Sequence, residues 1–193
     1  MQFTDHLTDA ELILAYQQGN ENALSVLITR HKDKVYTTLY MLVKDKYLAE
    51  DLFQDTFLKI VKTIKEGRYC EQGKFLQWAV RVARNLCMDH FRRTKVQVPV
   101  TLPDGQDISA IFGQSDLVAD AIERRQVHES VRKLVEGLPY EQREVIVLRM
   151  YSDLSFKEIS ELTGVSINTA LGRMRYALIN LRRLIADKQL VLR

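Results

Sequence analysis

The sequence predicts an all-α protein in which two small helical domains are joined by a flexible, acidic linker. Apolar residues recur at i, i+3 and i+4 over 22–44 and 47–65, a spacing that gathers them on one face of a helix. No segment shows the alternation of apolar and polar residues that a half-buried strand requires. Residues 96–123 hold two prolines, two glycines and five acidic residues without a lysine or arginine, a composition typical of a connecting segment.

Chain length, composition and charge exclude several classes of protein. The chain has 193 residues, of which 46% are hydrophobic, so it can form a packed core. Its longest apolar run, LYMLV at 39–43, is far shorter than the roughly 20 residues of a membrane span. The first 20 residues lack a basic region and a cleavage site, which predicts a cytoplasmic protein. The net charge is +3, and it is unevenly distributed: residues 1–95 carry +3, residues 96–123 carry −5 and residues 124–193 carry +5. Clustered basic charge indicates a polyanionic partner.

We place the first domain at residues 1–95, the linker at 96–123 and the second domain at 124–193. The first block has no proline before Pro99 and reads as helical almost throughout. Gly67 and Gly73 bracket a short loop, after which another helix begins at residue 75. Helical periodicity returns near Leu117 and is clear by Val127.

The residues that begin and end helices in the second domain have the spacing of a helix-turn-helix. Pro139 suits the start of a helix that runs to about residue 151. Ser155 and Glu158 have the spacing of a capping box, which starts a short helix over 156–162. Gly164 marks a turn, and Ser166 caps a longer helix that reaches about residue 186. In such a motif the second helix enters the major groove of DNA.

The expected 167–186 helix has two chemically different sides. The apolar side is formed by Ile167, Ala170, Leu171, Met174, Ala177, Leu178 and Leu181. The other side and its flanks carry Asn168, Thr169, Gly172, Arg173, Arg175 and Tyr176. Asparagine, threonine and arginine are side chains that read base edges and bind phosphates. The pattern favours DNA binding over the alternative of a bundle helix with a solvated polar face.

The helix expected from residue 75 contains the chain's only tryptophan, Trp78. Its apolar side is formed by Phe75, Leu76, Ala79, Val82, Ala83, Leu86 and His90, with Cys87 at the edge. Its other side carries Gln77, Arg81, Arg84, Asn85, Met88 and Arg92. Trp78 lies at the margin of the polar side, either to stack on an unpaired base beside the arginines or to fold back onto the core. We expect Cys87 and His90 to be packing residues, because they lack further ligands at the spacing of a zinc site.

Residues 49–64 are expected to form a helix with a second apolar sector. The main stripe contains Ala49, Phe53, Phe57, Ile60 and Ile64. Leu58 and Val61 lie outside it, next to Asp51, Gln54 and Asp55. Apolar residues outside the core stripe and rimmed by acids suit a protein partner, although neighbouring helices could equally cover them.

Together these segments resemble a bacterial RNA polymerase sigma factor of the sigma-70 family, in the small extracytoplasmic-function (ECF) group. The resemblance covers nearly the whole chain. It implies that residues 1–95 form sigma region 2, which binds core polymerase and recognises and melts the −10 element. It implies that residues 124–193 form sigma region 4, which recognises the −35 element. The implied function is promoter-specific transcription initiation, with no catalysis, cofactor or metal.

Two segments of the first domain carry this resemblance. DLFQDTFLKI is similar to the part of region 2 that docks on the beta-prime clamp helices, and it places polymerase contacts at Asp51, Gln54, Asp55 and Leu58. FLQWAVRVARNLCMDHFRR keeps the family pattern F-x-x-W-x-x-R-V-A-x-N. In the family this helix and the preceding loop open promoter DNA and capture a base of the non-template strand. The implied DNA contacts are Cys70, Glu71, Gln72, Gly73, Lys74, Trp78, Arg81, Arg84, Asn85 and Arg92.

The helix-turn-helix segment resembles region 4, with two departures. Leu171 replaces a basic residue of many members and Gly172 replaces a hydroxyl residue, whereas Thr169 and Arg173 keep their places. The implied contacts with the −35 element are Ser166, Asn168, Thr169, Arg173, Arg175 and Tyr176. The implied partners are core RNA polymerase (beta-prime clamp helices and beta flap), double-stranded and melted promoter DNA, and an anti-sigma factor of the kind that commonly restrains such proteins. No membrane insertion is expected.

Two other functions fit parts of the sequence. A stand-alone transcription regulator would use the helix-turn-helix but would not need the surface of Asp51, Gln54 and Asp55. A helical scaffold or sequestering protein would need no tryptophan at the polar margin of the 75–93 helix. Core polymerase binding distinguishes the first alternative, and promoter opening distinguishes the second.

Overall fold

The computed structural model describes residues 6–70, 72–94 and 130–187. Regular structure in these ranges is entirely helical, as the sequence predicted. By their contacts the residues divide into two compact units, one of 1–96 with 150–154 and one of 97–149 with 155–193. The expected linker at 96–123, and the return of helical periodicity near Leu117, lie outside the described residues.

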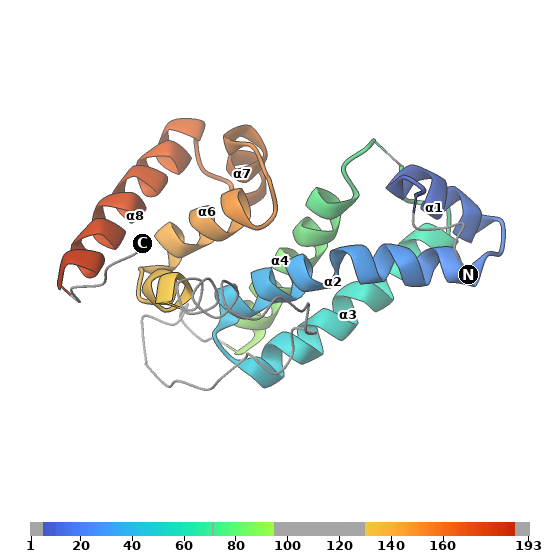
Figure 1. Ribbon diagram of the computed structural model, residues 1–193, viewed down its shortest axis with the longest axis horizontal. Coiled ribbons are helices and arrows are strands. Elements are labelled where there is room, and N and C mark those ends of the chain that lie inside the picture. The colour runs from blue at the N-terminus through green and yellow to red at the C-terminus, as the bar shows by residue number, and fades with distance from the viewer. Residues whose placement is uncertain (1–5, 71, 95–129, 188–193) are drawn as a thin grey trace, which may run out of the picture. The chain divides into compact units, whose positions relative to one another are not determined.

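The described part of the first unit contains helices α1 (Asp9–Gln17), α2 (Glu21–Val43), α3 (Lys46–Lys65) and α4 (Phe75–Thr94). The long helix α2 contacts each of the other three, and α3 also contacts α4 (Figure 1). Their apolar faces therefore meet in one core, which includes Leu27, Leu39, Ile60 and Phe75.

Helix α1 was not singled out by the sequence analysis, although its start carries a clear signal. The Thr8 hydroxyl accepts a hydrogen bond from the backbone N–H of Glu11 at 3.3 Å. The Glu11 carboxylate accepts one from the backbone N–H of Thr8 at 2.7 Å, which completes a capping box. Hydrogen bonds from the Thr8 backbone and then from its hydroxyl hold the pKa of Glu11 below its ordinary value. The Thr-x-x-Glu spacing was therefore sufficient to predict this helix.

The buried stripe of α4 is rotated relative to the sequence prediction. Val82, Leu86 and His90 were expected on the apolar side, but they are half-buried. The buried residues are Phe75, Leu76, Ala79, Val80, Ala83, Cys87 and Phe91. The reason is that α4 packs against both α2 and α3, so the small side chains between those helices become the centre of its stripe. Cys87 is completely buried, as expected of a packing residue.

Helix α3 follows its predicted stripe with one adjustment. Ala49, Phe57, Ile60 and Ile64 are buried as expected. Phe53 is half-buried, and its ring centroid lies 5.9 Å from that of Tyr36 and 4.8 Å from that of Phe57. Leu52 and Thr56 are buried in addition, and the Thr56 hydroxyl donates to the Leu52 carbonyl at 2.6 Å, which satisfies a polar group inside the core.

The described part of the second unit contains helical residues 130–136, α6 (Tyr140–Met150), α7 (Phe156–Thr163) and α8 (Ile167–Asp187). Its core includes the completely buried side chain of Arg143. The Arg143 guanidinium donates to the Leu138 carbonyl at 3.1 Å and lies over the Tyr140 ring at 5.6 Å from its centroid. Burial lowers the pKa of Arg143. This arginine holds the start of α6 to the turn that precedes it.

The packing of α8 differs from the prediction in one respect. Ala170 and Ala177 are buried as expected. Ile167, Leu171 and Leu178, which were expected on the packed side, are each 44% exposed. Two alanines one above the other let α8 approach its neighbours closely along a narrow line, so the larger leucines on its flank remain outside that line.

Candidate polymerase and nucleic-acid interface

One face of α3 remains exposed along much of its length. Asp51, Gln54 and Asp55 are exposed, and Leu58 is 68% exposed. The described helices therefore leave Leu58 uncovered, in contrast to the alternative that they bury it. Gln54 and Asp55 lie one helical turn before Leu58, and Asp51 lies two turns before it. An exposed leucine next to carboxylates on one helix face is typical of a contact surface for a protein with basic residues around an apolar patch.

Tyr47 extends this face and was missed by the sequence analysis. It is 75% exposed and precedes Leu58 by roughly three helical turns, so the two side chains lie on the same side of α3. The spacing between the two residues could have revealed it, because residues at multiples of a turn share a face. Tyrosine is among the residues that are enriched at the energetic centres of interfaces.

The loop between α3 and α4 leads into a cluster of aromatic rings. Phe75 is 1% exposed, and its ring centroid lies 5.2 Å from that of His31 in α2. The Trp78 ring lies 5.9 Å from Phe75 and 4.3 Å from Tyr69, centroid to centroid. Trp78 is thus half-buried, with part of its indole packed on neighbouring rings and part in solvent. It is neither a core residue nor a fully exposed one.

The expected DNA contacts of the first unit lie on this loop and on the outer side of α4. Cys70, Gln72, Gly73 and Lys74 are exposed, whereas Glu71 lies outside the described residues. Along α4, Arg81, Asn85 and Arg92 are exposed and Arg84 is half-buried. Arg92 pairs with Asp89 on its own helix. Because Trp78, Arg81 and Asn85 follow one another at one-turn spacing, the structure places them on one side of α4.

The geometry also bears on a metal site at the cysteines and His90 and on a membrane span. Cys70 and Cys87 are not joined in a disulfide; the first is exposed and the second is buried. No group of three or more potential metal-ligating side chains occurs within 6–70, 72–94 and 130–187. His90 is half-buried, and its ring packs against Phe91 with centroids 6.1 Å apart. None of the helices in these ranges is long and apolar enough to cross a bilayer.

Helices α7 and α8 form a helix-turn-helix with well-defined ends. Ser155 and Glu158 make the predicted capping box at the start of α7, with a hydrogen bond of 3.2 Å from the Glu158 N–H to the Ser155 hydroxyl. Gly164 ends α7 in the left-handed conformation, at φ 72°, which a residue without a side chain adopts at no steric cost. The Ser166 hydroxyl then accepts from the Thr169 N–H at 3.0 Å and caps α8.

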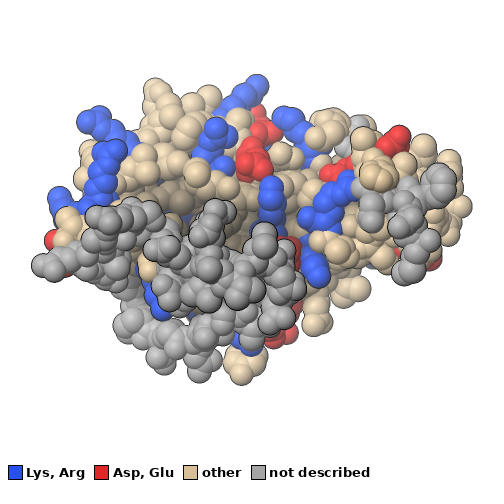
Figure 2. All heavy atoms as spheres, in the orientation of Figure 1, with Lys and Arg blue, Asp and Glu red and all other residues tan. Residues whose placement is uncertain are grey.

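The beginning of α8 presents polar side chains to solvent. Ser166, Asn168, Thr169 and Arg175 are exposed, Arg173 is half-buried, and Tyr176 is 62% exposed. In Figure 2, Lys and Arg side chains project along the left edge of the view, where Figure 1 shows α8. The positive end of the helix dipole lies at the N-terminus of α8 and favours an anionic partner such as a phosphate. The arrangement suits the major groove of DNA.

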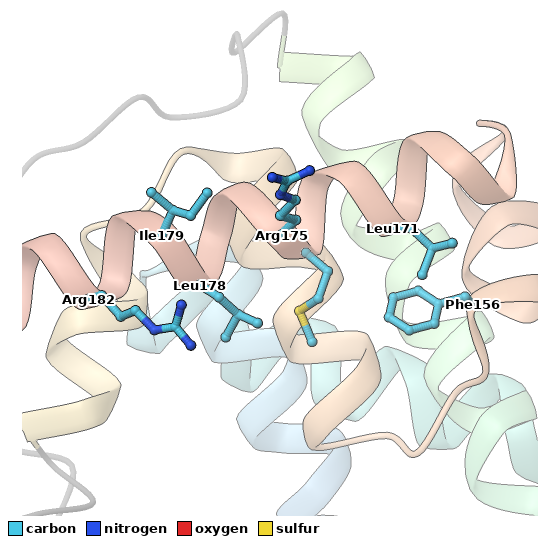
Figure 3. A pocket seen from close by; sticks show the side chains of 7 residues that line it. Phe156, Leu171, Arg175, Leu178, Ile179 and Arg182 are labelled. Carbon is cyan, nitrogen blue, oxygen red and sulfur yellow. The ribbon is translucent and has the colours of Figure 1, made fainter.

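An apolar groove of about 430 Å³ lies along the flank of α8. It is lined by Phe156, Leu171, Met174, Arg175, Leu178, Ile179 and Arg182. Figure 3 shows Leu171 of α8 directed toward Phe156 of α7, with Leu178 and Arg182 on the same side of α8. Leu171 and Leu178, which the sequence analysis placed on the apolar side of the helix, therefore form an open surface with Arg175 and Arg182 beside it.

Comparison with known families accounts for both units. Residues 27–96 match sigma-70 region 2, and residues 128–176 match sigma-70 region 4. ECF RNA polymerase sigma factor BldN of Streptomyces coelicolor is 31% identical over 180 residues, which cover 92% of this chain and 66% of BldN. ECF RNA polymerase sigma factor SigM of Bacillus subtilis is 30% identical over 136 residues, which cover 70% of this chain and 78% of SigM.

Solved structures show the same fold. The structure of CnrH in complex with the cytosolic domain of CnrY aligns with a TM-score of 0.59 at 21% identity, covering 93% of this chain and 97% of CnrH. The sigma factor RpoE from Bartonella quintana, in complex with the anti-sigma factor NepR, aligns with a TM-score of 0.59 at 20% identity, covering 82% and 94%. Sigma factors are non-catalytic subunits of RNA polymerase. The chain belongs to the ECF sigma factors of the sigma-70 family, which direct RNA polymerase to promoters and initiate transcription.

Proposed function

We propose that this sigma factor divides its task among three surfaces: the exposed face of α3 binds core polymerase, the loop after α3 with the outer side of α4 melts the −10 element, and the start of α8 reads the −35 element. The domains that carry these tasks are residues 1–95 and 124–193, with residues 96–123 as the linker. The observation that carries the proposal is Trp78, which is half-buried on the side of α4 that also presents Arg81 and Asn85.

The role of the α3 face rests on its exposed leucine. Leu58, at 68% exposure, follows Asp51, Gln54 and Asp55 on the same side of the helix. Burying this leucine against a partner stabilises the complex, and the two carboxylates select a partner with basic residues around its apolar patch. In this proposal the partner is the pair of beta-prime clamp helices of core polymerase.

The role of α4 rests on the combination of a ring and cations. An unpaired base stacks on an aromatic ring with little dependence on its identity, and arginines beside the ring bind the strand's phosphates. Trp78 supplies the ring, Arg81 and Arg84 the positive charge, and Asn85 a side chain that can read a base edge. Cys70, Gln72, Gly73 and Lys74 of the preceding loop hold the captured base in this proposal.

The role of α8 rests on its capped and exposed N-terminus. In this proposal Asn168, Thr169 and Arg173 contact base edges, and Ser166, Arg175 and Tyr176 contact the sugar-phosphate backbone. The sequence carries a net charge of only +3, which is small compared with that of a tight, independent DNA-binding protein. Binding to polymerase fixes the two readers at a set distance, so that two weak contacts act as one strong contact.

We also propose that an anti-sigma polypeptide restrains this chain, as CnrY and NepR are bound to their sigma factors in the similar structures. The apolar groove on α8, flanked by Arg175 and Arg182, supports a contact with an amphipathic helix that has an acidic rim. The beta flap of polymerase competes for region 4 in this proposal. Purification of the chain from its native cell, with and without added core polymerase, tests whether a partner is bound and then displaced.

The proposed role of α4 is tested by permanganate footprinting, which modifies unpaired thymines in an opened promoter. Holoenzymes with Trp78→Ala or Asn85→Ala are expected to bind the promoter through the −35 element but to leave the −10 region unreactive. Two control variants match the lost groups: Phe53→Ala removes a half-buried ring from α3, and Asn22→Ala removes an exposed amide from α2. Normal reactivity with both α4 variants would refute the role given to this helix.

A further inference from the structure

We propose that Tyr69 is a positioning residue for promoter melting: its ring holds Trp78 in place and closes the loop that captures the unpaired base. The proposal rests on the function given above to Trp78 and to the loop. Tyr69 does not belong to the family pattern identified in the sequence, and the basis for its role is its contact with Trp78.

The contact is the shortest in a cluster of three rings. The centroids of Tyr69 and Trp78 are 4.3 Å apart with their planes tilted by 47°. Phe75 lies 5.9 Å from Trp78 and 6.1 Å from Tyr69, so each ring touches the other two. Phe75 is 1% exposed and also packs against His31 of α2, which fixes the base of the cluster to the core. Tyr69 and Trp78 are half-buried above it.

The position of the two residues along the chain gives the contact its consequence. Tyr69 precedes the loop, and Trp78 follows it in the first turn of α4. The backbone N–H of Trp78 donates to the Lys74 carbonyl at 3.1 Å. Gly73 lies between them at φ 69°, a conformation that permits a sharp change of direction. The ring contact therefore joins the two ends of the loop. A loop whose ends are held together has fewer conformations to lose when it binds a base.

The same contact limits the motion of the indole. Trp78 has a rigid neighbour in Phe75 on the core side, and Tyr69 supplies the second contact that restrains its rotation. Without Tyr69, Phe75 is the one ring partner that Trp78 keeps among the described residues, and the orientation of the indole that suits stacking on a base becomes one of several. Measured coupling between aromatic pairs corresponds to at most about a tenfold change in an equilibrium constant.

The experiment uses holoenzyme reconstituted from core polymerase and the full chain, with two DNA probes of the same promoter. One is a fork-junction duplex with an unpaired non-template strand at the −10 element, and the other is a fully paired duplex that carries only the −35 element. Binding of each is measured by fluorescence anisotropy for the wild type, Tyr69→Ala, Trp78→Ala, the double variant and Tyr69→Phe. Phe53→Ala is the control, since it removes one ring from the other three-ring cluster of the same unit.

Tyr69→Ala is expected to weaken binding of the fork-junction probe by about tenfold and to leave binding of the −35 duplex within about twofold. Tyr69→Phe should restore fork-junction binding, because it keeps the ring. The double variant should bind no more weakly than Trp78→Ala alone, because Tyr69 acts through Trp78.

Three results would overturn the proposal in distinguishable ways. Wild-type holoenzyme that does not prefer the unpaired strand would remove the function of Trp78, and with it that of Tyr69. If Trp78→Ala weakens fork-junction binding but Tyr69→Ala does not, the function of Trp78 stands and that of Tyr69 is wrong. An equal loss with Phe53→Ala, or fully additive losses in the double variant, would assign the effect to general destabilisation.

Discussion

The Ser166 hydroxyl accepts a hydrogen bond from the backbone N–H of Thr169 at 3.0 Å, and the two side-chain hydroxyl groups lie 2.8 Å apart. The Ser166 carbonyl also accepts from the N–H of Ala170 at 3.0 Å. Ser166 thereby accepts hydrogen bonds from two backbone N–H groups in the first turn of α8. It also orients the hydroxyl of Thr169, a proposed contact with the −35 element. If the start of α8 binds the −35 element as proposed, the stability of the helix start and DNA recognition both depend on Ser166.

Ser166→Ala is expected to destabilise the chain by about 1 kcal/mol, because the cap is lost while the rest of α8 is unchanged. Binding of a −35 duplex should weaken as well, since the first turn of α8 loses its fixed geometry. Ser166→Asn, which retains a capping side chain, should recover most of the stability. Urea denaturation and anisotropy measure the two effects, and unchanged stability in Ser166→Ala would show that the cap contributes nothing.

Gly172→Ala should separate stability from DNA binding. An added Cβ would have no neighbouring atom within 4 Å, so the protein itself does not require a glycine here. The substitution is expected to stabilise α8 by about 1 kcal/mol, the usual difference between alanine and glycine inside a helix. If DNA approaches the helix closely at this position, affinity for the −35 duplex falls at the same time. If Gly172→Ala raises both the stability of the protein and its affinity for the −35 duplex, the DNA does not approach the helix closely at this position.

The double variant Asp51→Asn, Asp55→Asn is expected to weaken binding of core polymerase by about tenfold or more at low salt, and by less at high salt, because it removes charge from an exposed interface. Fluorescence titration of labelled chain with core polymerase measures this. Asp33→Asn, which removes an exposed carboxylate from α2, should leave the affinity unchanged. Equal affinities for all three proteins would contradict the assignment of the α3 face.

Arg173→Ala should reduce both affinity and sequence discrimination for the −35 element, at a cost of about 1–3 kcal/mol for the preferred sequence. The dependence of affinity on salt should also decrease, since one positive charge near the phosphates is lost. Arg183→Ala, which removes an exposed arginine from the other half of α8, is the matched control. If both variants behave alike, Arg173 contributes charge but not recognition.

Local chemistry made much of this fold predictable. Ser155, Gly164 and Ser166 are punctuation residues whose roles depend on their own backbone, so the positions of α7 and α8 followed from the sequence. The Thr8–Glu11 capping box at the start of α1 has the same Ser/Thr-x-x-Glu spacing as the one at Ser155, so α1 was predictable from the same kind of local signal. Leu58 could be placed outside the core stripe of α3, but only the packed helices decide whether another element covers it.

Features that depend on packing partners were not predictable in the same way. The helical projection of α4 contains no information on its packing partners; α4 contacts both α2 and α3, and its buried stripe is rotated toward Val80 and Phe91. Leu171 and Leu178 have the helical spacing of core residues, yet both are exposed. A helical projection cannot show that α8 packs along Ala170 and Ala177 and leaves these leucines outside the contact. The contact between Tyr69 and Trp78 spans a loop, and periodicity gives no information on the path of a loop.

The central claim is that this chain confers promoter specificity on core RNA polymerase through two separate DNA elements. Transcription in vitro with core polymerase and a randomised promoter library tests it most directly. Sequencing of the transcripts should reveal start sites that share two conserved elements at a constant separation, with selection at the upstream element lost in Arg173→Ala and opening at the downstream element lost in Trp78→Ala. Transcripts that match those of core polymerase alone, or selection of a single element unaffected by either substitution, would contradict the account.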